Sequence, residues 1–404
     1  MDKDMLKNKS REIEKNAEVL FEQISAFIFG HPELGGEEFK SSEFLTDLML
    51  KEGFDVKYPY GSEKTAFRAE KKHGDGPVIA LLAEYDALPG YGENGEPAHA
   101  CGHNWIAAVS AGTAIVLGRM IEQLNGSVVL IGTPAEETYG GKIVMLEDGC
   151  FEDIDIVLQA HLEEYTDIIV PALAMDSLKF SFTGKAAHAA SYPYEGINAL
   201  DAVQLTFAGI NALRQQLRSD IRVHGIVTDG GQAVNIIPDK AECALYVRGS
   251  SRNHVDSATE RVINCARGAA LMTGAKLEIS RPDPSFDDLI RIPTLVKLAE
   301  SNMKSNGFDK VYRDDAPTPG STDIGNVSYK VPTLYVEVAL EGKAVFKVHD
   351  VEALRYADSK EAYSRMHQMI RSFSGIAIDL FLEPELIIQA KKELSEQLAD
   401  LGGK

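Results

Sequence analysis

The sequence predicts an α/β protein: a discontinuous domain with a mostly parallel sheet flanked by helices, interrupted by a smaller inserted α+β domain. Two observations favour this fold class. Short apolar runs typical of buried strands alternate with helical segments in both halves of the chain, an order that implies parallel strands. Between them, strands of alternating polarity accompany two helices. We therefore expect residues 1–173 and 288–404 to form the larger domain and residues 174–287 to form the insert.

Two helices are expected before the first buried strand. In residues 10–30 apolar side chains recur at every third or fourth position, as on one face of an amphipathic helix, and Gly30 and Pro32 end the pattern. The polar loop 31–38 separates this helix from a second one at about residues 40–53.

Three strand-and-helix units follow. The apolar runs 77–83, 127–132 and 154–160 predict buried strands, and helices are expected between them at residues 105–123 and 141–147. Ligands of open α/β proteins bind beyond the carboxyl ends of the parallel strands. Side chains at these strand ends are therefore the first candidates for a functional site.

The insert and the C-terminal part supply the remaining elements. The insert is expected to contain strands at 177–182, 222–228, 241–248 and 276–281 and helices at 198–218 and 255–273. The α/β pattern resumes with a helix at 294–306, a buried strand at 331–338 and a final helical stretch from about residue 357.

Composition excludes several classes of protein. The formal net charge of −20, from 61 acidic against 41 basic residues, argues against nucleic acid or an anionic membrane as a partner. No apolar run approaches the roughly 18 residues of a membrane span, and residues 1–9 lack the apolar core of a signal peptide. Four cysteines in 404 residues make no disulfide framework. We therefore expect a cytoplasmic protein.

A thiol and an imidazole lie two positions apart at Cys101 and His103, where a helix is expected to begin. A helix N-terminus favours the thiolate, the form that binds metal. Alone, the pair is more commonly a buried thiol beside a structural histidine. A redox Cys-x-x-Cys motif is excluded because no second cysteine is nearby, and a structural zinc finger would need a second pair.

Two adjacent carboxylates, Glu136 and Glu137, follow the buried strand 127–132 through Thr133 and Pro134. Adjacent carboxylates are common on solvated surfaces, but a surface pair is unusual directly after a buried strand. In a hydrolytic site one member can bind metal while the other takes a proton from metal-activated water.

Two histidines also lie at strand ends: His161 ends the strand 154–160, and His349 follows a later buried strand. Alone, such a histidine is more often a satisfied core residue. Together with Cys101, His103 and Glu137, these two histidines make five side chains that offer nitrogen, sulfur or oxygen donors. That set suits two divalent ions, zinc first, with manganese, cobalt or nickel as alternatives.

Further polar residues are candidates for supporting roles. Asp86 is placed to orient a ligand histidine, while Glu84 beside it receives no role. His188, in the insert, can donate to a developing oxyanion if the insert covers the site or that of a partner subunit. Asn235 and Arg248 can receive a substrate carboxylate. The alternative for the three insert residues is an ordinary turn or surface position.

With these residues identified, the chain resembles, over nearly its whole length, the dinuclear metallopeptidase and amidohydrolase family of carboxypeptidase G, aminoacylases and indole-acetyl-amino-acid hydrolases. The motifs that carry the resemblance are Glu-Tyr-Asp-Ala-Leu-Pro at 84–89, His-Ala-Cys-Gly-His-Asn at 99–104, Thr-Pro-Ala-Glu-Glu at 133–137, Gly-Lys-Ala-Ala-His-Ala-Ala at 184–190, His161 and His349. The resemblance implies that the metal ligands are Cys101, His103, Glu137, His161 and His349.

The resemblance also implies roles for other parts. Glu136 matches the general base, and the insert matches a lid and dimerisation domain whose His188 reaches a neighbouring active site. Cys-Gly-His-Asn at 101–104 and the segment 320–328 look closer to the subgroup of aminobenzoyl-glutamate hydrolase and β-alanyl-dipeptide dipeptidase. Ser321 and Thr322 in that segment are further candidates for substrate binding.

Glu84 departs from the pattern of the classical peptidases of this family, which carry a ligand histidine in a His-x-Asp motif at this position. Cys101 is the expected substitute for that ligand.

We therefore predict a metal-dependent enzyme that hydrolyses an amide or peptide bond in a small N-acyl amino acid or dipeptide, and that forms a homodimer or a higher homo-oligomer. Metal-activated water loses a proton to Glu136, which passes it to the leaving amine. Two alternatives remain: a non-catalytic metal-binding or peptide-binding protein, which the intact Glu136 argues against, and a thiol hydrolase using Cys101 with His103.

Overall fold

The computed structural model describes residues 2–313, 320–342 and 345–402. The described residues cluster into two compact units. The larger unit holds residues up to 170, from 289 to 313 and from 326 onward, and the smaller unit holds residues 171–288 together with 320–325. The segment 320–325, which the sequence prediction placed in the larger domain, thus clusters with the smaller unit.

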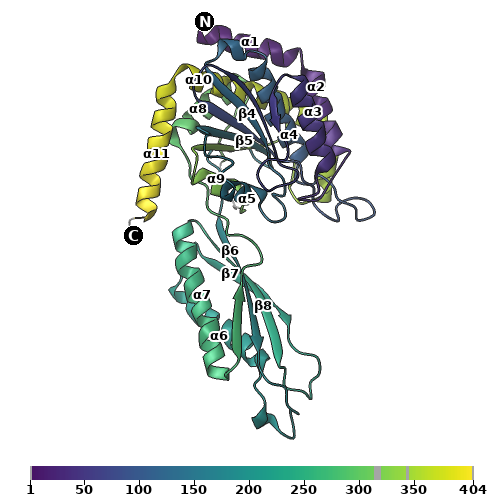
Figure 1. The fold of residues 1–404 in the computed structure, drawn as a ribbon, viewed down its shortest axis with the longest axis vertical. Helices are drawn as coiled ribbons and strands as arrows, with labels where there is room; N and C mark the ends of the chain where they lie inside the picture. Colours follow the sequence, from purple (N-terminus) through teal and green to yellow (C-terminus); the bar gives the residue numbers. More distant parts are fainter. Residues whose placement is uncertain (1, 314–319, 343–344, 403–404) are drawn as a thin grey trace. The chain divides into compact units, whose positions relative to one another are not determined.

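The larger unit is built on a six-stranded sheet in the order β1-β2-β4-β3-β5-β10. Figure 1 labels two of its strands, β4 and β5. The strands are β1 (Asp55–Lys57), β2 (Phe67–His73), β3 (Val78–Ala83), β4 (Gly126–Gly132), β5 (Ile156–Leu162) and β10 (Thr333–Val338). β3 pairs in parallel with β4 and β5, and β5 pairs in parallel with β10. The predicted mostly parallel sheet is therefore confirmed.

The helices of the larger unit include two that the sequence prediction merged. They are α1 (Lys3–Lys15), α2 (Glu18–Phe29), α3 (Phe39–Lys51), α4 (His103–Gly118), α5 (Gly141–Glu147), α8 (Pro293–Ser305), α10 (Lys360–Leu382) and α11 (Pro384–Gly402). The short helix α9 (Ile324–Ser328) contains residues of both units. The single helix expected over residues 10–30 is wrong, because the chain breaks at Asn16 and Ala17. The apolar periodicity continues across this break, so the pattern did not reveal it.

Helix α4 is the centre of the larger unit, and all of its residues are buried. It packs against β3 and β5 on one side and against α2 and α10 on the other. Most of its side chains are apolar, as is typical of a helix buried on all sides, and the one tryptophan of the chain, Trp105, donates from its indole nitrogen to the Ala362 carbonyl at 2.8 Å. This packing fixes the N-terminal end of α4, where Cys101 and His103 lie.

The smaller unit has its own core and an antiparallel sheet in the order β7-β8-β6-β9. Its strands are β6 (Ala174–Thr183), β7 (Arg222–Asp229), β8 (Lys240–Gly249) and β9 (Lys276–Ser280). Helices α6 (Ala199–Leu213) and α7 (Arg252–Thr273) lie side by side against this sheet (Figure 1). The predicted α+β texture of the insert is thus present.

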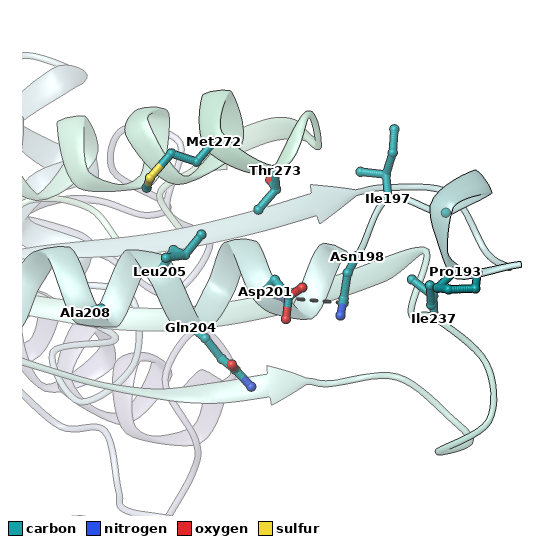
Figure 2. A pocket seen from close by; sticks show the side chains of 11 residues that line it. Pro193, Ile197, Asn198, Asp201, Gln204, Leu205, Ala208, Ile237, Met272 and Thr273 are labelled. Atoms are coloured by element: carbon teal, nitrogen blue, oxygen red, sulfur yellow. Dashed lines mark hydrogen bonds between the residues drawn. The ribbon is translucent and has the colours of Figure 1, made fainter. Parts of the chain in front are cut away.

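A cavity of about 740 Å³ lies beside α6 in the smaller unit. Figure 2 shows the side chains that line it, Asp201, Gln204 and Met272 among them. At its edge the Asn198 side chain caps α6 by accepting hydrogen bonds from two backbone N–H groups. None of the predicted site residues is among the described residues that line this cavity. Among the described helices, none is long and apolar enough to cross a membrane.

Gly112 lies where α4 meets both α2 and α10, and its substitution tests this packing. A Cβ at Gly112 would meet Ile370 Cδ1 at 2.6 Å and Phe21 Cδ1 at 3.2 Å, whereas a Cβ at Gly268 in α7 would meet nothing within 4 Å. Gly112→Ala should lower the free energy of unfolding by about 1–3 kcal/mol through overpacking. Gly268→Ala, the matched control, should raise it by about 0.5–1 kcal/mol through helix propensity. Denaturant unfolding of both variants checks this, and equal shifts would contradict it.

Candidate metal centre

The candidate site lies at the carboxyl ends of three parallel strands of the larger unit. Glu84 and Asp86 follow β3, Glu136 and Glu137 follow β4, and His161 is the penultimate residue of β5. Because β3 pairs in parallel with both β4 and β5, these ends meet at one edge of the sheet.

Two further segments bring donors to this edge. Cys101 and His103 stand at the start of α4, and Gly102 between them takes a left-handed conformation with φ of 79°. His349 lies beyond β10, where its backbone N–H donates to the Ala100 carbonyl at 3.0 Å. This bond holds the His349 segment against the one that carries Cys101.

The structure brings all five predicted ligand side chains together. Cys101 Sγ lies 3.5 Å from His161 Nε2, and Glu137 Oε1 lies 3.2 Å from His349 Nε2 and 3.8 Å from His103 Nε2. Three overlapping groups each keep their donor atoms within 4.8 Å: Cys101 with His103 and His161, Cys101 with Glu137 and His349, and His103 with Glu136 and Glu137.

Hydrogen bonds orient the rings of the buried His103 and the half-buried His161. His103 Nδ1 lies 2.7 Å from Asp86 Oδ1, and His161 Nδ1 lies 2.8 Å from the Leu162 carbonyl oxygen. These oxygens accept, so each Nδ1 donates and each Nε2 is left to face the donor cluster. His103 Nε2 is buried with no hydrogen-bond partner in the described part of the chain. A cation would satisfy this nitrogen, so the donor set fits a bound metal.

Asp86 acts on both sides of the cluster, because its second oxygen, Oδ2, accepts from the Glu137 backbone N–H at 2.9 Å. One carboxylate thus fixes the ring of His103 and the loop that carries the two glutamates. This is the orienting position that the sequence suggested for Asp86.

The charges of the cluster favour a bound cation. Burial alone would lower the pKa of His103, but Asp86, Glu84 and Glu137 raise this pKa to about 10. Burial and the Glu137 and Glu136 carboxylates raise the pKa of the Cys101 thiol well above its usual value. Burial and these carboxylates thus outweigh the N-terminus of α4, which by itself would favour the thiolate. In the absence of a metal they therefore disfavour Cys101 as a nucleophile. A divalent ion reverses both effects, since it binds neutral imidazole and thiolate.

Sequence reasoning missed a buried ion pair beside the donors. Glu84 Oε1 accepts from Lys142 Nζ at 2.5 Å and from Gln159 Nε2 at 2.8 Å, and the Glu84 and Lys142 side chains are both buried. Burial would raise the pKa of Glu84, but Lys142, His103 and His161 lower it below its ordinary value. A lysine in a helix is usually a surface residue, so no pattern pointed to Lys142.

Glu38 is a second buried carboxylate that sequence reasoning missed. Its Oε1 accepts from the Ala135 backbone N–H at 2.8 Å, and its Oε2 accepts from the Thr65 hydroxyl at 2.7 Å. Ala135 has a φ of 60°, in the left-handed region that non-glycine residues rarely adopt. Glu38 therefore anchors the turn that leads into Glu136. Burial and the charge of Asp86 raise the pKa of Glu38 to about 7.

The remaining predicted residues lie in the smaller unit, where they form two groups. The exposed His188 lies beside Asn235, whose carbonyl accepts from the Ala189 N–H at 3.0 Å. Arg248 Nη1 donates to Ser321 Oγ at 3.5 Å, and the neighbouring Thr322 carbonyl accepts from a backbone N–H at 3.2 Å.

Nitrogen, sulfur and oxygen donors gathered beside a carboxylate pair, at the carboxyl ends of parallel strands, are the arrangement of a metal-dependent hydrolase. The model of peptidase family M20/M25/M40 matches residues 80–372. The chain belongs to this family, which confirms the resemblance seen in the sequence.

Related proteins cover nearly the whole chain. The Xaa-Arg dipeptidase of Mus musculus is 34% identical over 98% of this chain and 94% of its own length. One of the subunits of the p-aminobenzoyl-glutamate hydrolase of Escherichia coli is 36% identical over 94% of this chain and 92% of its own length.

Solved structures show the same fold. A putative aminohydrolase from methicillin-resistant Staphylococcus aureus has a TM-score of 0.80 at 20% identity, over 93% of this chain and 99% of its own. A dinuclear metal-binding peptidase of Bacillus subtilis has a TM-score of 0.68 at 24% identity, over 90% and 99%. The chain is thus a metal-dependent hydrolase of amide or peptide bonds in small substrates.

The raised pKa of Glu38 makes stability depend on pH. The unfolded chain releases this proton near the ordinary pKa of 4.5 and the folded chain near about 7, so native stability should fall as pH rises through this window and level off above it. Glu38→Gln keeps an acceptor for Ala135 without the charge. The free energy of unfolding of this variant minus that of the native protein should therefore rise by about 3 kcal/mol between pH 4.5 and 8.

Denaturant unfolding of chelator-treated protein across this range checks the prediction. Glu37→Gln, at the exposed neighbouring position, is the matched control for loss of a negative charge. The same pH-dependent gain in both variants would show that the buried position of Glu38 is not its cause.

Proposed function

We propose that the chain hydrolyses a small N-acyl amino acid or dipeptide with two divalent ions, zinc first, held by Cys101, His103, Glu137, His161 and His349. The observation that carries this proposal is the convergence of these five donors beside Glu136. Manganese, cobalt and nickel remain alternatives, because the mixed donor set accepts borderline divalent ions generally.

Glu136 is proposed as the general base. It lies in a donor group with His103 and Glu137, and the backbone of its neighbours is fixed by Glu38 and Asp86. When bound, the divalent ions supply Lewis-acid activation, which brings the pKa of a water toward about 7. Glu136 takes a proton from that water as the new carbon–oxygen bond forms. It then delivers the proton to the amine nitrogen as the carbon–nitrogen bond breaks.

His188 is proposed to donate a hydrogen bond to the tetrahedral oxyanion. Its Nδ1 accepts from the backbone N–H groups of Ala190 and Ser191 at 3.3 and 3.2 Å. The proton of the neutral ring is therefore on Nε2, which makes this exposed edge a donor. Asn235 beside it, and Arg248 with Ser321 and Thr322, are proposed to receive the substrate carboxylate.

A homodimer through the smaller unit is also proposed, with His188 serving the active site of the partner subunit. The edge strand β7 supports this, because Ile226 and Val227 on it are 67% and 48% exposed. An exposed apolar edge strand is a template for pairing with another chain. All four cysteines are free, as expected in the reducing cytoplasm, which we propose as the location.

The Glu136→Gln variant tests the proposed base. It should keep about two divalent ions per chain, because the substitution leaves the five ligands intact, while kcat falls at least ~100-fold. The assay panel holds N-acyl amino acids, aminobenzoyl-glutamate and dipeptides ending in arginine or glutamate, before and after chelation and metal restoration. Glu147→Gln, at an exposed position of α5, is the control and should retain full activity. Near-native turnover by Glu136→Gln would remove Glu136 from the role.

Mixing two inactive variants tests the proposed sharing of sites between subunits. Glu136→Gln and His188→Ala should each be inactive as homodimers. A mixed dimer has one site with both Glu136 and His188 intact, so random reassociation should restore about 25% of native activity. Activity after subunit exchange is the measurement. No recovery, with dimer exchange shown by size and mass, would place His188 outside the partner's site.

A further inference from the structure

We propose that Glu84 is a sixth metal-binding side chain of this cluster, acting through Oε2 on the ion that His103 holds. Lys142 and Gln159 hold its other oxygen. This inference rests on the metal site proposed above and adds a ligand that the sequence pattern did not assign.

The two oxygens of the Glu84 carboxylate have different surroundings. Oε1 accepts from Lys142 Nζ and Gln159 Nε2. Oε2 is buried and has no hydrogen-bond partner among the residues that the structure describes. A role as the counter-ion of Lys142 alone explains Oε1 but not Oε2. A buried carboxylate oxygen left without a partner is costly, so its orientation needs another cause.

The imidazole of His103 supplies that cause. Glu84 Oε2 lies 3.9 Å from His103 Nε2, which is itself buried and without a hydrogen-bond partner in the described chain. Since His103 Nδ1 donates to Asp86, the neutral ring offers a lone pair on Nε2. At 3.9 Å the two atoms are too far apart to share a hydrogen bond, whether or not Nε2 carries a proton. A cation satisfies both.

The distances fit coordination. Glu137 Oε1, a proposed ligand, lies 3.8 Å from the same His103 nitrogen, close to the 3.9 Å of Glu84 Oε2. An ion bound at about 2.1 Å from each ligand atom can join atoms up to about 4.2 Å apart. Glu84 is therefore as well placed toward His103 as Glu137 is.

The buried Lys142 gives the arrangement its charge balance. Two divalent ions together with Lys142 carry five positive charges, and they face five negative ones: the Cys101 thiolate and the carboxylates of Glu84, Asp86, Glu136 and Glu137. The bond of Lys142 to Oε1, shared with Gln159, leaves Glu84 a single oxygen for the ion.

Metal binding by Glu84→Gln, measured without reference to activity, tests the inference. The isosteric amide keeps an acceptor for Lys142 and removes the anionic oxygen. Competition with a chromophoric chelator should show that the native chain binds two ions. In the variant, the affinity for one of these ions should be at least ~10-fold lower. Cobalt-substituted protein should show a changed visible spectrum, because one ligand of one ion is lost.

Gln159→Met is the matched control, because it removes the other hydrogen bond to Oε1 and leaves the carboxylate in place. Its two metal affinities should stay native. If Glu84→Gln does not fold, the double variant Glu84→Gln/Lys142→Met removes both charges of the ion pair. The same loss of metal affinity is expected in this double variant. Two ions of native affinity in either folded variant would overturn the role of Glu84. A native chain that binds no ions would instead overturn the proposed metal site.

Discussion

The bidentate carboxylate of Asp86 is the interaction on which the site depends. It accepts from His103 Nδ1 at 2.7 Å and from the Glu137 backbone N–H at 2.9 Å, so it joins the end of β3 to the start of α4 and to the loop after β4. One buried side chain therefore sets the ring orientation of one proposed ligand and the backbone position of another. The loop that it fixes also carries Glu136, so the proposed base and the donor cluster are positioned together.

The charge of this region explains why so many ionisable groups remain buried together. Carboxylates are rarely buried unless paired, yet Glu38, Glu84 and Asp86 are all buried. Each is held by a specific donor: a backbone N–H for Glu38, an ammonium group for Glu84, an imidazole for Asp86. Divalent ions supply the remaining positive charge, which connects the fold of the loops to metal binding.

Much of the fold followed from the sequence because its core strands are apolar runs. β3, β4 and β5 were predicted, and with them the edge at which Cys101, His103, Glu137 and His161 meet. Strand β2 was missed because Arg68, Glu70 and two lysines interrupt its apolar pattern. Glu38 and Lys142 were missed for another reason. Their roles arise from contacts 97 and 58 residues away in sequence, which no local spacing reveals.

The division of residues between the two units bears on substrate choice. The proposed ligands and Glu136 all lie in the larger unit, whereas the proposed substrate-carboxylate residues, Asn235 and Arg248 among them, lie in the smaller one. Two relatives of similar identity are named for substrates of opposite side-chain charge, an Xaa-Arg dipeptide and an aminobenzoyl-glutamate. Relatives of similar identity thus differ in the substrate for which they are named, and the proposed mechanism requires the donor cluster and Glu136 but no particular amino acid.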